Sequence, residues 1–117
     1  MTIPVQITFR HMDSSAAVET RVRELADHLG VFSDRIQSCR VVVDSPHRHH
    51  SHGKVFNVKV QLALPGEDVV VDMERPQRDG HEDVYVVIRD AFEAAERQLK
   101  QRMAALRGEQ KLREKLV

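Results

Sequence analysis

The chain has 117 residues, of which 41% are hydrophobic, and this length suits a single domain that buries roughly two-thirds of the surface exposed by its unfolded chain. No stretch approaches the ~18 consecutive apolar residues of a membrane span, and the N-terminus lacks the basic and apolar segments of a secretory signal, so we expect a cytoplasmic protein with no membrane partner. Eighteen basic and 18 acidic residues give a net charge of zero, so composition alone does not indicate nucleic-acid binding.

The first part of the chain predicts a strand, a helix and a second strand. Residues 3–9 alternate between apolar and polar side chains, which is typical of a half-buried strand. A helix is predicted from the capping side chains of Asp13–Ser15 to about Leu29. The second strand is predicted over Ile36–Asp44. It carries the sole cysteine, Cys39, which we expect to be a small buried apolar residue rather than a nucleophile.

The second part predicts two strands and a long helix. Val55–Leu64 alternates clearly, residues 65–68 form a turn, and Val69–Met73 returns as the next strand. A long helix is predicted over Glu82–Leu106, because apolar residues recur there at steps of three and four and form one stripe. The stripe consists of Val84, Ile88, Ala91, Phe92, Ala95, Leu99, Met103 and Leu106.

The predicted order is β-α-β-β-β-α, an α+β fold. A helix between the first two strands favours a parallel crossover, whereas short links between the later strands favour antiparallel hairpins. Each strand has one apolar face and each helix one apolar stripe, so we predict two helices packed on one face of a four-stranded mixed sheet. We expect residues 1–106 to form the single domain and residues 107–117 to be a polar tail that is frayed or disordered.

Signatures of catalysis are weak in this sequence. It contains no glycine-rich loop that would cradle a phosphate and no paired-carboxylate signature. His11 and the nearby Asp13–Ser15 segment are more simply explained as the start of a helix than as a nucleophile with its base. We therefore expect no enzymatic activity, no cofactor and no small-molecule substrate.

A histidine-rich segment interrupts the chain between the second and third predicted strands. Four histidines occur within six residues: His47, His49, His50 and His52. Imidazoles at such spacing can bind zinc, copper or nickel, although side chains at a hairpin tip rarely place four nitrogens around one ion. A solvated hairpin is the simplest interpretation. Contact of these rings and of Arg48 with a phosphate backbone is a further alternative.

Basic residues of the two predicted helices are stronger candidates for a binding surface. From Arg97 to Arg107 every charged residue is basic, namely Arg97, Lys100, Arg102 and Arg107. Positive charge near a helix C-terminus also complements the helix dipole, so this distribution alone leaves a structural role open. The functional alternative is a ridge that contacts phosphates, to which Arg21 or Arg23 on the first helix and Arg10 would add.

Two motifs resemble a known family. Asp83-Val84-Tyr85-Val86-Val87-Ile88 and Glu96-Arg97-Gln98-Leu99 are similar to the D-x-Y-x-x-I and E-R-Q-L segments of a helix in the ribosome hibernation promoting factor family. That family includes the ribosome-associated translation inhibitor and is also known as sigma-54 modulation protein, or S30EA-like. Ile7-Thr8, Phe32-Ser33-Asp34-Arg35-Ile36 and the predicted β-α-β-β-β-α order resemble it too. The similarity covers about residues 3–102, and the chain resembles the short, single-domain forms.

The resemblance implies a bacterial, non-enzymatic stress and stationary-phase protein that occupies the mRNA and tRNA channel of the small ribosomal subunit and inhibits translation. The implied partners are the 30S subunit, the 70S ribosome and the phosphates of 16S rRNA. Arg97 falls on the family motif. The other implied contact residues are inferred from their positions on the helices and are Arg21, Arg23, Arg89, Lys100 and Arg102. Arg48 is an additional candidate.

Two other functions stay open from the residues alone. One is a metal-binding stress protein that uses the four histidines. The other is a regulatory module that binds another protein through the polar sheet face or the tail.

Overall fold

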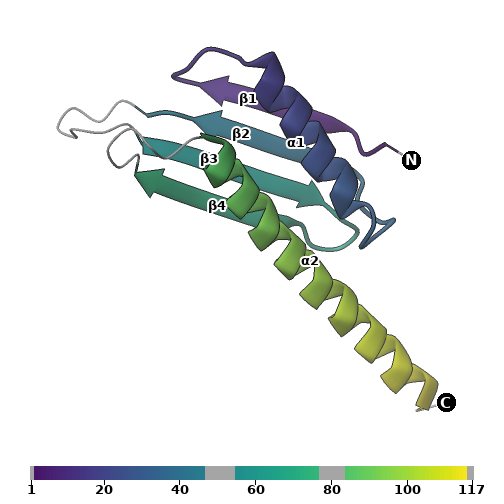
Figure 1. Cartoon of the computed structure of the whole chain (residues 1–117). Coiled ribbons are helices and arrows are strands. Elements are labelled where there is room, and N and C mark those ends of the chain that lie inside the picture. The colour runs from purple at the N-terminus through teal and green to yellow at the C-terminus, as the bar shows by residue number, and fades with distance from the viewer. Residues whose placement is uncertain (1, 47–54, 77–83, 116–117) are drawn as a thin grey trace.

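The computed structural model describes residues 2–46, 55–76 and 84–115. Along this part of the chain the elements are β1 (Val5–Arg10), α1 (Ala16–Leu29), β2 (Ser38–Asp44), β3 (Val55–Ala63), β4 (Val69–Pro76) and α2 (Val84–Lys115). The strands form one sheet in the order β1-β2-β3-β4 (Figure 1). β1 is parallel to β2, and the other two pairings are antiparallel. The predicted element order and mixed sheet are confirmed.

Both helices cover the same face of the sheet (Figure 1), and the hydrophobic core lies between the two layers. Strand register decides which side chains enter this core. Val41 of β2 is paired with Val60 of β3, and both are fully buried. The next pair, Val42 with Lys59, points to the opposite face, where Lys59 is exposed. Burying an aliphatic side chain of this size contributes about 1.5–3 kcal/mol, so the alternation fixes which face carries the helices.

Helix α1 begins and ends where its local sequence allows. Ser15 is the N-cap: its backbone is extended and its hydroxyl oxygen accepts from the N–H of Val18 at 3.2 Å. That hydrogen bond satisfies one of the N–H groups that the first helical turn leaves without a partner. At the other end, the N–H of Gly30 donates to the carbonyl of Asp27 at 3.0 Å. The buried face of α1 consists of Val18, Val22, Ala26 and Leu29.

Helix α2 is 32 residues long and therefore about 48 Å from end to end. Its buried stripe contains Ile88, Phe92 and Leu99, as predicted, and also Val87. Leu99 is the last fully buried residue of α2 in the described part, and Leu106 is already 40% exposed. The C-terminal part of the helix extends beyond the sheet and continues to Lys115 (Figure 1). The helix is thus longer than its apolar stripe, and a domain boundary at residue 106 stays a prediction.

Cys39 lies on the core face of β2 and is fully buried, as predicted. Burial raises the pKa of its thiol to about 12, so the reactive thiolate is scarce at neutral pH. Among the described helices, none combines the length and the apolar character needed to span a membrane.

The turn between β3 and β4 is closed by the carboxylate of Asp68. This carboxylate accepts from the side-chain amide of Gln61 at 2.8 Å and from the N–H of Leu64 at 3.3 Å. The hydrogen bond from Gln61, then that from Leu64, and finally the charges of Arg102 and Arg40 lower the pKa of Asp68. A carboxylate with a lowered pKa stabilises the folded state above its unfolded pKa of about 3.9. That contribution is lost as pH falls through the folded pKa.

We therefore expect Asp68→Asn to be less stable than the wild type at pH 7, with the difference shrinking as pH falls from about 4 to 2. Urea unfolding across this pH range measures it. Asp27→Asn removes the same charge from an exposed position on α1 and serves as the control. A difference between Asp68→Asn and wild type that stays constant with pH would contradict the assigned role.

Candidate nucleic-acid interface

The two helices lie side by side on the sheet, and a groove of about 320 Å³ runs between them. Arg21 of α1 and Arg89 of α2 line this groove from opposite sides, together with Leu25, His28 and Phe92. The structure therefore brings two of the predicted contact residues together across the helix pair.

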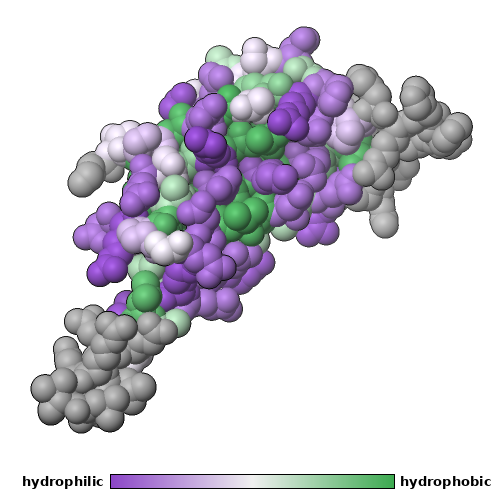
Figure 2. Space-filling model, turned by 180° about the vertical axis from the view of Figure 1, so that it is seen from behind, coloured by the Kyte–Doolittle hydropathy of each residue, from purple (hydrophilic) through white to green (hydrophobic). Residues whose placement is uncertain are grey.

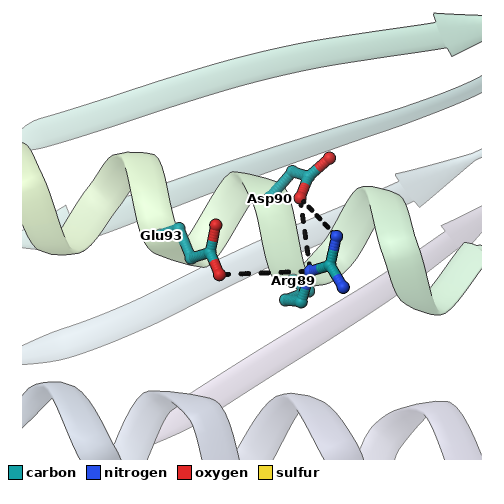
Figure 3. Close-up of polar contacts among 3 residues, drawn as sticks. All are labelled: Arg89, Asp90 and Glu93. Atoms are coloured by element: carbon teal, nitrogen blue, oxygen red, sulfur yellow. Dashed lines mark hydrogen bonds and ion pairs between the residues drawn. The ribbon is translucent and has the colours of Figure 1, made fainter.

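Each of these two arginines has acidic neighbours on its own helix. Arg21 lies 3.1 Å from Glu24, and Arg89 lies 3.2 Å from Asp90 and 4.0 Å from Glu93 (Figure 3). About half of each arginine side chain is exposed. Ion pairs this exposed contribute about 0–1 kcal/mol, so a phosphate could replace the carboxylates at little cost.

Lys100 is held at the junction of α2 and the loop that follows α1. Its Nζ lies 3.5 Å from Glu96 and 4.5 Å from the centre of the Phe32 ring. Glu96 also lies 3.3 Å from the His28 imidazole, whose ring meets Phe32 edge-on with the ring centres 5.4 Å apart. This cluster, which the sequence did not predict, positions the Lys100 ammonium beside the groove while leaving about half of its side chain exposed.

Arg97 and Arg23 are exposed, and within the described residues neither forms an ion pair. On α2, Arg97 lies about 180° from Ile88 in the helical projection, so it points directly away from the sheet. Arg23 lies about 200° around α1 from Arg21, on the flank away from α2. Arg97 is thus central to the outer surface of the helix pair, whereas Arg23 stands apart from the groove.

Arg102 faces the interior and does not share this surface. Only 24% of its side chain is exposed. Its Nη2 donates to the carbonyl of Asp68 at 3.2 Å and lies 3.9 Å from the Glu67 carboxylate. Nη1 is buried and has no hydrogen-bond partner in the described part of the chain. The sequence could have predicted that Arg102 lies on the buried side of the helix. Residue 102 is three positions after Leu99 and seven after Ala95, and both of these belong to the apolar stripe.

Arg48 and the four predicted metal-ligating histidines lie outside the described residues. In the described part, no group of three or more His, Cys, Asp or Glu residues could hold a metal ion. The described structure therefore offers no metal site in support of that alternative.

Comparisons with known proteins give a consistent family. Residues 5–107 match the family described as Sigma 54 modulation protein / S30EA ribosomal protein. The structure is similar to the Thermus thermophilus Protein Y N-terminal domain, with a TM-score of 0.66 and 26% identity over 86% of this chain and 98% of that chain. It also shares its fold with a ribosomal subunit interface protein from Coxiella burnetii, with a TM-score of 0.63 and 19% identity over 87% of this chain and 99% of that chain. No curated protein sequence matched. Because the family match covers most of its length, the chain belongs to the Sigma 54 modulation protein / S30EA ribosomal protein family.

Proposed function

We propose that this protein binds the small ribosomal subunit in the cytoplasm, occupies its mRNA and tRNA channel, and inhibits translation by binding rather than by catalysis. The observation that carries the proposal is the family match over residues 5–107, which includes the motif containing Arg97. The fold shared with a protein described as a ribosomal subunit interface protein agrees with this partner. The 30S subunit, the 70S ribosome and 16S rRNA are the expected binding partners.

We assign the contact to the outer surface of the helix pair, which we call the helix face. It comprises Arg21, Arg23, Arg89, Arg97 and Lys100, with Arg48 as a further candidate. Arg97 is the central residue because it is exposed and has no ion pair in the described structure. Arg21, Arg89 and Lys100, which lie in or beside the groove, exchange weak carboxylate contacts for rRNA phosphates when they bind.

Sedimentation through sucrose gradients tests the proposal. We expect the protein to migrate with 30S and 70S particles at low salt and to dissociate steeply as salt rises, because each neutralised phosphate releases counterions. A protein that stays at the top of the gradient at low salt would falsify the proposed function. Inhibition of translation in a cell-free system, competing with mRNA, then tests occupation of the channel.

Arg102 is predicted to serve the fold rather than the ribosome. Arg102→Met keeps most of the aliphatic packing and removes the buried Nη1 that lacks a partner, while losing the hydrogen bond to Asp68. We expect the free energy of unfolding to change by about 1 kcal/mol or less and ribosome association to be retained. Urea unfolding and gradient sedimentation measure the two effects. A loss of ribosome binding without a loss of stability would instead make Arg102 a contact residue.

A further inference from the structure

The sheet face away from the helices carries a hollow of about 220 Å³. It is lined by Gln6 and Thr8 of β1, Arg40 and Val42 of β2, and Lys59 and Gln61 of β3. This face is largely hydrophilic, with a few hydrophobic areas (Figure 2). Arg21, Arg23, Arg89, Arg97 and Lys100 lie on the helices, which cover the opposite face of the sheet (Figure 1).

Strand register places the two cations of the hollow close together. Gln6, Arg40 and Gln61 form one row across β1, β2 and β3. Thr8, Val42 and Lys59 form the next row on the same face. Arg40 and Lys59 are therefore diagonal neighbours, whose Cα atoms lie about 7–8 Å apart and whose long side chains can reach a common ligand.

Local carboxylates only partly neutralise these two cations. No acidic residue lines the hollow. Arg40 is exposed, and its side chain has no hydrogen bond or ion pair in the described structure, although its charge acts on Asp68. Lys59 lies 3.9 Å from Asp72, with half of its side chain exposed, and a contact this long and exposed contributes little. Both positive charges are thus available to an anion.

The neutral donors of the hollow complete the site. One of the two N–H groups of the Gln61 side-chain amide already donates to Asp68 at 2.8 Å. The amide of Gln6 and the hydroxyl of Thr8 remain to donate hydrogen bonds beside the two cations. A phosphate accepts several such bonds, and those from charged donors are about twice as strong as neutral ones.

We propose that this hollow binds a phosphate of an RNA backbone, with Arg40 and Lys59 supplying charge and Gln6 and Thr8 supplying neutral donors. RNA is favoured over a free nucleotide because no aromatic side chain lines the hollow. A base would therefore have no ring on which to stack. A polymer compensates by presenting many phosphates. The domain would then contact RNA on both faces, which the proposed function does not require.

Nuclear magnetic resonance of the full chain with a short oligouridine at low salt tests the site. We expect amide shifts to change at Gln6, Thr8, Arg40 and Lys59. In the double variant Arg40→Gln with Lys59→Gln these changes disappear, and the slope of log affinity against log salt falls in magnitude by about 0.7 for each cation removed, as for single-stranded nucleic acid. Arg75→Gln removes a cation from β4 outside the hollow and should leave the changes intact. Shifts that are absent in the wild type, or that persist in the double variant, overturn the site.

Two control titrations test whether the ligand is RNA rather than a nucleotide and whether the hollow binds independently of the helix face. Uridine monophosphate at the same phosphate concentration should shift the four amides less than the oligomer does, and an equal effect overturns the assignment to RNA. The second control is the same oligouridine titration of the double variant Arg97→Glu with Lys100→Glu. This variant loses binding at the helix face, but the amide shifts of Gln6, Thr8, Arg40 and Lys59 should still change. If they vanish, the hollow is not an independent site. Ribosome sedimentation of this helix variant tests the proposed function alone, so the two failures are distinguishable.

Discussion

Reversing two charges on the helix face, Arg97→Glu with Lys100→Glu, is expected to remove the protein from the ribosomal fractions of a sucrose gradient. A hydrogen bond to a charged group contributes about 1.5–3 kcal/mol, so two lost phosphate contacts weaken binding about a hundredfold or more. The free energy of unfolding should change by about 1 kcal/mol or less, because the contacts of Lys100 with Glu96 and Phe32 are exposed and individually weak. Sedimentation and urea unfolding of the same preparation separate binding from folding.

The matched control changes net charge by the same amount on the sheet. Arg10→Glu with Arg75→Glu replaces two exposed arginines that lie outside the helix face. We expect this variant to keep most of its ribosome binding. If both double variants lose binding equally, bulk charge rather than the helix face determines association. If the helix variant sediments as the wild type does, the contact surface is assigned to the wrong face.

The largest effect on stability is expected at Leu99. This side chain is fully buried against the sheet, and truncating a buried leucine to alanine typically costs about 2–5 kcal/mol because a cavity remains. Leu99→Ala should therefore lower the free energy of unfolding by about 3 kcal/mol without changing the dependence on denaturant. Urea unfolding followed by circular dichroism measures it.

Leu106→Ala provides the internal comparison on the same helix. Leu106 is 40% exposed, so its truncation removes less buried surface and should cost about 1 kcal/mol or less. Equal losses at the two positions would mean that the helix packs as far as Leu106. That result would contradict the burial pattern described above.

The fold was predictable because each element repeats a simple period. Val58, Val60 and Leu62 alternate with polar residues, and burial of one face follows directly from that alternation. The stripe through Ile88 and Leu99 defines α2 in the same way. The helix between the first two strands also sufficed to predict their parallel pairing. Strand alternation and helical stripes are local properties of the chain, so the spacing of apolar residues along the sequence is enough to predict them.

The details of the candidate site depend on contacts between distant segments. Lys100 lies over the ring of Phe32, which follows the first helix and is far from Lys100 along the chain. Arg102 donates to Asp68 in a turn between two strands. A charge pattern along one helix counts each of these residues as an exposed cation, because it contains no information on what packs beside them. The exposure of Arg97 follows from its position opposite the stripe, and its role in binding stays a prediction.

The long C-terminal end of α2 implies a gradient of local opening along a single helix. Backbone amides near Ala95 and Leu99 are covered by the core and should exchange with solvent only when the whole domain unfolds. Leu106, Arg107 and Gly108 are exposed, and a Cβ atom built on Gly108 would meet no atom within 4 Å apart from its own helix backbone and chain neighbours. Amide protection should therefore decline turn by turn, and a protease should cleave near Arg107 while the sheet stays intact. The domain then has no sharp end along α2, because amide protection declines gradually over several turns. Hydrogen exchange can measure this decline residue by residue.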